Sequence, residues 1–131
     1  AERLRGGLTV RPAREGETLR ALDGKDYRLS PQHIVIADED GPQSLAGVMG
    51  GLHSGVTEGT VDVLVESALW DPLRIARSGR ELRIQSDARY RFERGVDPAM
   101  CAEGLDRAVA LILAHAGGEA SAMSVAGAMP D

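Results

Sequence analysis

An aspartate followed by a proline occurs twice in the second half of the sequence, at Asp71-Pro72 and Asp97-Pro98. The aspartate carboxylate can cap the first turn of a helix, and proline fits the first helical position, where no backbone donor is needed. The two pairs therefore predict helices over 71–83 and 98–116. Apolar residues at spacings of three and four support the second helix, and Gly117-Gly118 is a typical end for it.

The first half of the sequence has the pattern of short strands and turns. In the segment 7–29, apolar residues alternate with polar ones, and Asp23-Gly24 between apolar residues indicates a hairpin, because such turns require positive φ. We expect buried strands over His33–Ala37 and Val61–Glu66, and a weak closing strand over Ser121–Ala128. Because the strands precede most of the helices, the expected class is α+β, with antiparallel or mixed sheet layers covered by at least two helices.

The length of 131 residues fits one domain with its own core, so we expect a single domain over 1–131. No apolar run is long enough to span a bilayer, and we expect no signal peptide, because the chain does not open with a basic region followed by an apolar stretch. Cys101 is the sole cysteine, which excludes a disulfide framework and favours a reducing compartment. The first residue is Ala1 rather than methionine, which indicates either processing or a piece of a longer protein.

The charge balance argues against a dominant nucleic-acid surface, since 20 acidic residues outnumber 15 basic ones. Arginine supplies all the basic residues except Lys25, and base composition of the genome explains this bias. The arginines are nevertheless concentrated in one stretch of the sequence. We therefore keep the alternative of a locally basic surface on an otherwise acidic domain. The residues in this stretch are Arg74, Arg77, Arg80, Arg83, Arg89, Arg91 and Arg94.

Few residues have the pattern of a reactive site. The three histidines, His33, His53 and His115, lack metal-ligand spacing, so we expect no metal site. The glycine-rich stretch Gly47–Gly51 lacks the lysine of a phosphate-binding loop, and we interpret it either as a turn or as the wall of a pocket. Cys101 lies on the apolar stripe of its helix and is expected in the core.

Glu66 is the acid that stands out. It closes an apolar run that we expect to be buried, and a buried carboxylate is unfavourable unless it is paired. One interpretation is a structural salt bridge to an arginine. The other is a carboxylate that accepts a hydrogen bond from a ligand.

Several motifs occur together along the chain, in the order of one known family. They are Glu15–Leu19, Leu22–Gly24, Ala46–Gly51, Val63–Ala68, Ser86–Ala88 and Tyr90–Pro98. On these motifs the chain resembles the tRNA-editing domain in the beta subunit of bacterial phenylalanine–tRNA ligase. The chain departs from that pattern at Leu52, where an acid is usual, at Arg89, where a small residue is common, and over Leu82–Gln85, where the family has a glycine.

The resemblance implies hydrolysis of tyrosine wrongly attached to the phenylalanine tRNA. It assigns Glu66 to recognition of the tyrosine phenol, and it places Gly50, Ser86 and Ala88 in the editing pocket. It names no catalytic side chain, and we expect a positioned water to attack the ester. A second site that bonds the extra hydroxyl is needed because a phenylalanine pocket rejects it poorly.

The resemblance also implies partners and surroundings. These are the phenylalanine tRNA mischarged with tyrosine, and an alpha subunit in an assembly of two alpha and two beta chains in the cytoplasm. We expect no cofactor in this stretch, with ATP and magnesium used elsewhere in the parent enzyme. A histidine-bearing segment of the family is expected just before Ala1, so the isolated stretch is expected to be inactive. The alternatives are a structural or tRNA-docking module of the same subunit and a binding protein unrelated to tRNA.

Overall fold

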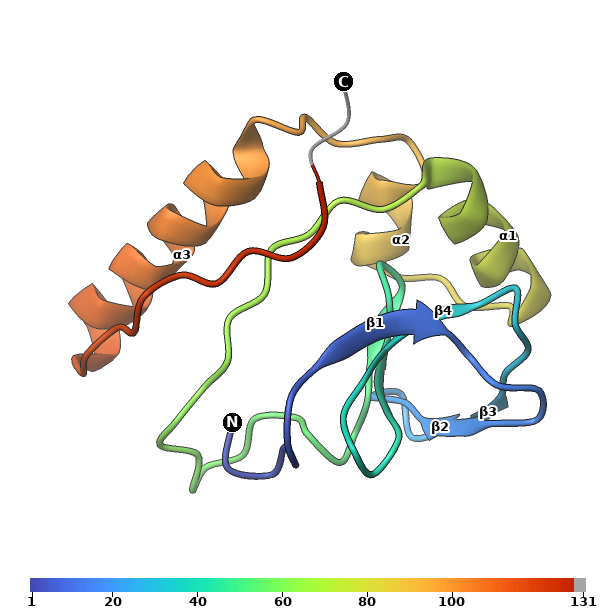
Figure 1. Ribbon diagram of the computed structural model, residues 1–131, viewed down its shortest axis with the longest axis horizontal. Helices are drawn as coiled ribbons and strands as arrows, with labels where there is room; N and C mark the ends of the chain where they lie inside the picture. The colour runs from blue at the N-terminus through green and yellow to red at the C-terminus, as the bar shows by residue number, and fades with distance from the viewer. Residues whose placement is uncertain (129–131) are drawn as a thin grey trace. The chain divides into compact units, whose positions relative to one another are not determined.

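Six short strands precede the helices, as the turn-rich first half of the sequence predicts. Four of them form an antiparallel sheet in the order β1-β4-β5-β6, and β2 and β3 form a separate antiparallel hairpin (Figure 1). Gly24 turns this hairpin with φ of 78°, as Asp23-Gly24 predicts. The strands are β1 (Thr9–Pro12), β2 (Thr18–Arg20), β3 (Asp26–Arg28), β4 (Ile34–Ala37), β5 (Pro42–Leu45) and β6 (Met49–Gly50).

The computed structural model describes residues 1–128, and the chain divides into two compact units. The sheet unit comprises Ala1–Val63 and Trp70–Gly95, and the α3 unit comprises Leu64–Leu69 and Val96–Asp131. Both contain helices, so the expected α+β class is confirmed. No helix within residues 1–128 is long and apolar enough to cross a membrane.

Two of the helices begin close to the Asp-Pro pairs. In α1 (Pro72–Glu81), Asp71 caps the first turn by accepting a hydrogen bond from the backbone N–H of Arg74 at 3.0 Å. In α3 (Met100–Ala116), the helix starts two residues later than predicted, because Asp97 accepts instead from the N–H of Ala99, in a turn before the helix. The predicted helices are confirmed with these shifted bounds.

A third helix, α2 (Asp87–Phe92), is an addition to the prediction. It has six residues, too few for an apolar periodicity to show. Its signal is local: Ser86 caps the helix by accepting from the N–H of Arg89 at 3.0 Å, and Asp87 provides an acid in the first turn. Ser86 followed by Asp87 is the pattern that could have predicted it.

The core of the sheet unit joins β-strand residues to the region of α1. Leu19, Leu29, Val35, Leu45 and Val48 are buried almost completely, and Ile75 of α1 and Ile84 after it pack into the same cluster. The half-buried Trp70 also packs there. The apolar face of α1 thus covers the strands, as the expected layers require.

Two predicted strands are absent from the described residues. Val61–Glu66 and Ser121–Ala128 have no strand pairing, and most of their apolar side chains are exposed, to 83% at Val61 and 82% at Val125. Both sequences have strand-like composition, but a strand also requires a neighbouring strand to complete its backbone hydrogen bonds. The N–H groups of Val61 and Asp62 donate to the Glu2 carboxylate at 3.0 and 2.9 Å, and within residues 1–128 neither segment pairs with a strand, so the strand predictions and the expected burial of the first segment are wrong.

The α3 unit has a weaker interior than the sheet unit. Cys101, Leu105, Ala108 and Val109 form the predicted stripe on α3, but each is only half-buried, and none of the helix residues is fully buried. The Cys101 sulfur lies 3.7 Å from the Ser67 hydroxyl, so the residue predicted to lie in the core sits at the edge of this packing.

Candidate functional site

The Ser86 hydroxyl joins the start of α2 to the glycine-rich turn of the sheet. Besides capping α2, it donates a hydrogen bond of 2.5 Å to the carbonyl oxygen of Val48. Gly50 follows two residues after Val48, and Ala88 follows two residues after Ser86. The sheet unit therefore brings three of the four predicted pocket residues into one neighbourhood, around a single hydrogen bond.

In this turn, Gly47 and Gly51 lie where the fold leaves no room for a side chain. Gly47 has φ of 67°, and a Cβ there would lie 2.7 Å from Ile75. A Cβ on Gly51 would lie 2.5 Å from the backbone oxygen of Gln43. Both positions are required by the fold, which favours the interpretation of this stretch as a turn.

Gly50 is the exception among these glycines. A Cβ added there would lie 3.2 Å from Cδ1 of Leu22, the end of a flexible side chain that is 55% exposed. The Gly50 carbonyl accepts a hydrogen bond from the N–H of Leu22 at 3.0 Å, which fixes the backbone on one side. The surrounding backbone therefore does not require a glycine at this position, and the interpretation of Gly50 as part of a pocket wall stays open.

Glu66 belongs to the α3 unit, so neither unit by itself brings it together with the other three residues. It is exposed rather than buried, and within residues 1–128 its carboxylate has no hydrogen-bond donor and no ion-pair partner. Neighbouring protein atoms still displace part of its hydration, and this desolvation raises the pKa of the carboxyl above its usual value. The expected structural salt bridge is therefore absent from the described residues.

The charged stretch around α2 contains a buried arginine. Arg89 donates to the carbonyl oxygen of Ile84 at 2.7 Å and to Glu93 at 2.9 Å. Its side chain occupies the space where a Cβ on Gly79 would be, which explains a glycine within α1. Glu93 also pairs with Arg94 at 3.2 Å, and together these contacts join α2 to the end of α1 rather than to the sheet.

The histidines have structural roles or are exposed. His33 is buried directly before β4; its Nδ1 accepts from the N–H of Ser30 at 3.0 Å, and its Nε2 lies 3.0 Å from a Glu81 carboxylate oxygen. The accepting Nδ1 places the proton on Nε2, which then donates to Glu81. His53 and His115 are exposed. Within residues 1–128 no group of three or more histidine, cysteine and acidic side chains could hold a metal ion.

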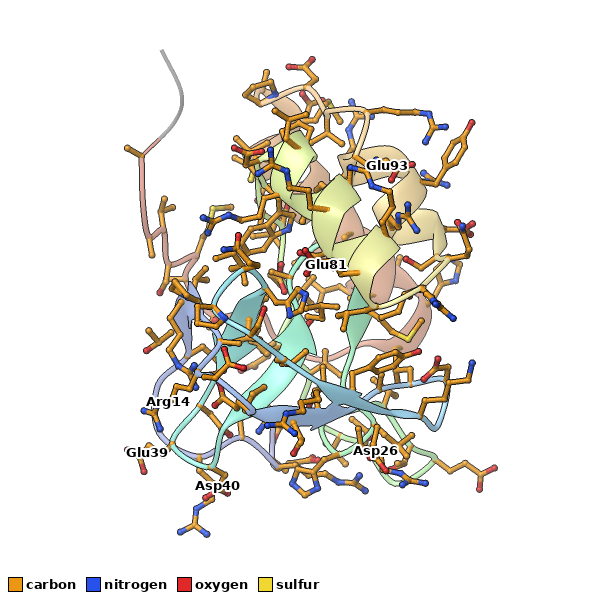
Figure 2. The ribbon with its side chains drawn as sticks, turned by 90° about the vertical axis from the view of Figure 1, so that its right-hand side faces the viewer. Arg14, Asp26, Glu39, Asp40, Glu81 and Glu93 are labelled. Carbon is orange, nitrogen blue, oxygen red and sulfur yellow. The ribbon has the colours of Figure 1, made fainter. Side chains whose placement is uncertain are left out.

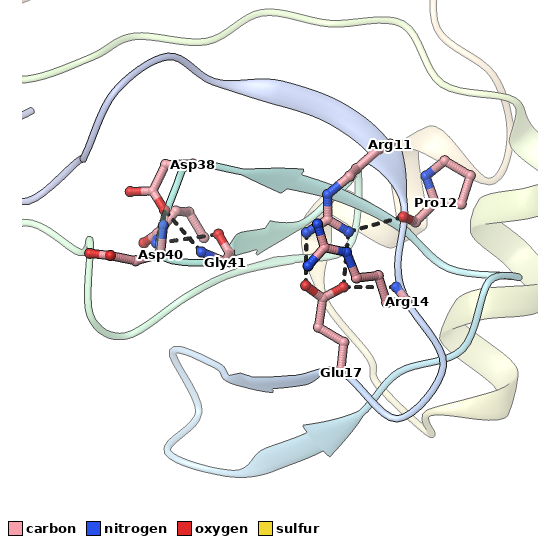
Figure 3. A network of polar contacts seen from close by, with 8 residues as sticks. Arg11, Pro12, Arg14, Glu17, Asp38, Asp40 and Gly41 are labelled. Carbon is pink, nitrogen blue, oxygen red and sulfur yellow. Dashed lines mark hydrogen bonds and ion pairs between the residues drawn. The ribbon is translucent and has the colours of Figure 1, made fainter.

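A polar depression of about 600 Å³ lies on the sheet unit, and none of the predicted pocket residues lines it. Figure 3 shows its main contacts: Arg11 binds Glu17 through two hydrogen bonds of 2.9 and 2.7 Å, and the N–H of Arg14 donates to the same carboxylate. Asp38 accepts from the N–H groups of Asp40 and Gly41. Because these charges satisfy one another, the depression has the character of a structural network.

Comparison with known proteins adds the family. The family model of the B3/4 domain matches residues 1–117. The chain belongs to the B3/4 domain family. It is also similar to the phenylalanine–tRNA ligase beta subunits of Brucella suis, at 58% identity over 130 residues, and of Ruegeria pomeroyi, at 55% over 131 residues. These matches cover 99% and 100% of the chain.

This B3/4 domain chain spans 16% of the length of either relative. The resemblance found in the sequence is therefore confirmed at the level of the family and of similarity to the beta subunit. Its residue assignments, at Glu66, Gly50, Ser86 and Ala88, stay predictions.

Proposed function

We propose that this chain is part of the beta subunit of a phenylalanine–tRNA ligase. The matches over nearly the whole chain, at 55–58% identity, support this, because they extend across both units rather than one motif. The partners are then an alpha subunit and the phenylalanine tRNA, in the cytoplasm. ATP and magnesium act in other parts of that enzyme.

We further propose that residues 1–131 act as an editing domain, which hydrolyses tyrosine from the phenylalanine tRNA. Tyrosine and phenylalanine differ by one hydroxyl, and a site with a hydrogen-bond acceptor for that hydroxyl discriminates between them strongly. Glu66 supplies the acceptor. Gly50, Ser86 and Ala88 leave space for the aromatic ring because their side chains are small.

The observation that carries the proposal is the unpaired carboxylate of Glu66. Within the described residues no arginine or backbone donor satisfies it, so its oxygens are free to accept a hydrogen bond from a phenol. Partial desolvation strengthens such a bond, because fewer water molecules compete for the carboxylate. A carboxylate in a structural ion pair would lack this capacity.

The hydrolytic step is proposed to use a water molecule. The water oxygen attacks the ester carbonyl carbon, and the bond from that carbon to the ribose oxygen breaks. The products are tyrosine and the deacylated tRNA. Backbone N–H groups and the neighbouring ribose hydroxyl of the terminal nucleotide assist, since the candidate residues Glu66, Gly50, Ser86 and Ala88 include no base positioned for the ester.

The experiment is deacylation of tyrosyl-tRNA by the complete ligase with and without Glu66→Ala. We expect the change to slow tyrosine removal by roughly 100-fold, the effect typical of losing one specific hydrogen bond to a charged group. Glu119→Ala, which removes another carboxylate of the same unit, is the matched control and should keep full activity. Equal rates for the enzyme with and without Glu66→Ala would contradict the editing assignment of this residue.

The contribution of a side-chain base is tested with His53→Ala in the same assay. The water mechanism predicts unchanged tyrosine removal, because within residues 1–128 no hydrogen bond or ion pair joins the His53 side chain to a candidate pocket residue. Loss of hydrolysis with intact tyrosine binding would instead identify His53 as a base and replace this mechanism.

A second candidate function is a structural or tRNA-docking module. The observation that favours it is the Ser86 hydroxyl, which is fully used in capping α2 and in binding the Val48 carbonyl. In that case Glu66→Ala would not lead to the accumulation of tyrosyl-tRNA. The deacylation assay of the same variant separates the two functions.

A further inference from the structure

The seven arginines between residues 74 and 94 fall into two groups in the structure. Arg89 is buried and fully bonded, and Arg94 lies 3.8 Å above the ring of Tyr90 and pairs with Glu93. These two hold α2 in place. The other five are exposed and form no ion pair with a carboxylate in the described part of the sheet unit; they are Arg74, Arg77, Arg80, Arg83 and Arg91.

Three of the five form a ridge along α1. Arg74, Arg77 and Arg80 are three residues apart, which places each about 4.5 Å further along the helix axis, at neighbouring positions on its surface. Arg83 directly follows the C-cap, and Arg91 lies on α2, which packs against α1. We call these five residues the arginine surface.

Helix stability does not explain the ridge on α1. The first turn of α1 has no acidic residue and carries Arg74, although the positive end of the helix dipole favours carboxylates there. Neighbouring cations at a spacing of three also repel each other. Arg80 lies in the last turn, where a cation suits the dipole, but Arg74 does not, and none of the three forms an ion pair in the described part of the sheet unit. Neighbouring cations without an acidic partner fit a ligand that compensates their charge.

The charge is also separated within the sheet unit. Residues 70–95 carry seven arginines against four carboxylates, a net charge of +3, whereas residues 1–63 carry seven basic and ten acidic residues, a net charge of −3. Figure 2 shows Asp26, Glu39 and Asp40 at the end of this unit opposite to α1 and α2. A unit without net charge therefore presents one cationic end, which orients it toward a polyanion.

We propose that the arginine surface binds phosphate groups of the tRNA backbone during editing. This inference rests on the proposed function, which provides the tRNA. Guanidinium groups bind phosphate oxygens with two parallel hydrogen bonds, and several arginines in a row match the repeated charge of a nucleic-acid strand. The surface would hold the acceptor part of the tRNA while the aminoacyl end reaches the pocket.

The test measures binding of uncharged phenylalanine tRNA to the complete ligase over a series of salt concentrations. The variant is the triple change Arg74→Gln, Arg77→Gln and Arg80→Gln, since glutamine keeps the helix propensity. We expect roughly tenfold weaker binding at low salt and a slope of log affinity against log salt that falls by about 2 to 3, roughly 1 per phosphate contact. The matched control removes the same charge elsewhere on the sheet unit, with Arg5→Gln, Arg20→Gln and Arg28→Gln, and should keep the slope.

A second triple variant, with lysine in place of Arg74, Arg77 and Arg80, keeps the charge and should recover most of the salt slope. Equal slopes for the glutamine triple variant and the unchanged ligase would overturn the proposal, as would equal losses in the glutamine and control triples. A glutamine triple that keeps tRNA affinity but loses binding to phosphatidylserine vesicles would assign the surface to membranes and overturn it too.

The two proposals fail separately in these experiments. Loss of the salt slope in the glutamine triple with no tyrosyl-tRNA hydrolysis by the unchanged ligase would leave the arginine surface standing and reject editing. Hydrolysis that depends on Glu66, with salt slopes unaffected by the glutamine triple, would give the opposite result.

Discussion

The sheet unit and the α3 unit use apolar residues differently. The sheet unit surrounds nearly inaccessible side chains such as Val35 and Leu45. In the α3 unit the helix has no fully buried residue, and Leu111 is 61% exposed. The difference shows that one unit has a core of its own, while the other leaves apolar surface of the kind that packing against further protein covers.

The largest expected contrast comes from two leucines. Leu45→Ala removes buried methyl groups and should lower the free energy of unfolding by about 2–5 kcal/mol, whereas Leu111→Ala on the exposed side of α3 should change it by less than about 0.5 kcal/mol. Urea unfolding measures the Leu45 variant, and amide exchange in α3 measures the Leu111 variant. Trp70 is the single tryptophan and packs on the core of the sheet unit, so its fluorescence follows that unit. Similar losses for both variants would show that the α3 unit also has a tight interior.

Replacing a glycine by alanine should change stability in opposite directions in the two units. At Gly47, positive φ and the close approach of Ile75 make Gly47→Ala destabilising by about 1–3 kcal/mol. Gly104 lies inside α3 with open space around its Cα, and Gly104→Ala should stabilise that helix by about 0.5–1 kcal/mol. Amide exchange in α3 measures the second effect. A stabilising Gly47→Ala would refute the tight packing of the turn.

The two units should also respond to pH in opposite directions. In the sheet unit, hydrogen bonds from Arg11 lower the pKa of Glu17, so its contribution to stability is present above the unfolded value near 4.3 and is lost as the pH falls through the folded value. Glu17→Gln should therefore destabilise by about 1 kcal/mol at pH 7 and by nothing in strong acid.

At Glu66 the folded pKa is raised, so the charged form is disfavoured above that value and the penalty disappears as the pH falls below the unfolded value. Glu66→Gln should slightly stabilise the α3 unit at pH 7. Unfolding curves at pH 3 to 7 for both variants, with amide exchange of α3 for the second, check both signs. A destabilising Glu66→Gln at pH 7 would reveal a favourable partner of the carboxylate.

The smallest effect concerns the ends of the two longer helices. After α1, Arg83 has φ of 54°, and the N–H groups of Arg83 and Ile84 donate to the carbonyls of Arg80 and Gly79, as in a Schellman motif. After α3, the C-cap itself is Gly117, and the position that corresponds to Arg83 is Gly118, also a glycine, with φ of 101°.

Arg83→Gly should therefore stabilise the sheet unit by roughly 0.5 kcal/mol, because it relieves the left-handed conformation of a residue with a Cβ. Arg83→Ala keeps the Cβ and serves as the control without gain. Thermal unfolding, monitored through Trp70 fluorescence, measures the stability of both variants. Equal gains for both would show that the arginine side chain, rather than the backbone, is the source of strain.

Local chemistry made much of the fold predictable. The Asp23-Gly24 turn and the Asp71 cap depend on residues within four positions of each other, and both form as expected. The segment Val61–Glu66 shows the limit, because its composition fits a strand but pairing depends on a neighbour elsewhere in space. The prediction that Glu66 is buried was wrong for the same reason.

The candidate site was less predictable than the fold. The small side chains at Gly50 and Ala88 and the hydroxyl of Ser86 were selected through resemblance to a family. The bond from Ser86 to the Val48 carbonyl joins residues 38 positions apart, and no sequence pattern reports such a contact. Arg89 is similar: only its packing against Gly79 explains why a large residue is tolerated there.

The edges of the four-stranded sheet offer little backbone for pairing with another chain, unlike the segment Val61–Glu66. The outer strand β1 ends in Pro12, and the outer strand β6 has only two residues, so neither edge offers a long row of free backbone groups. In Val61–Glu66 the first two residues bond to Ala1 and Glu2, but the segment has neither a proline nor a strand partner within residues 1–128 and combines β-branched residues with exposed side chains. Aggregation of the purified chain should therefore begin at this segment, and a lysine in place of Val63 should suppress it while leaving the sheet intact.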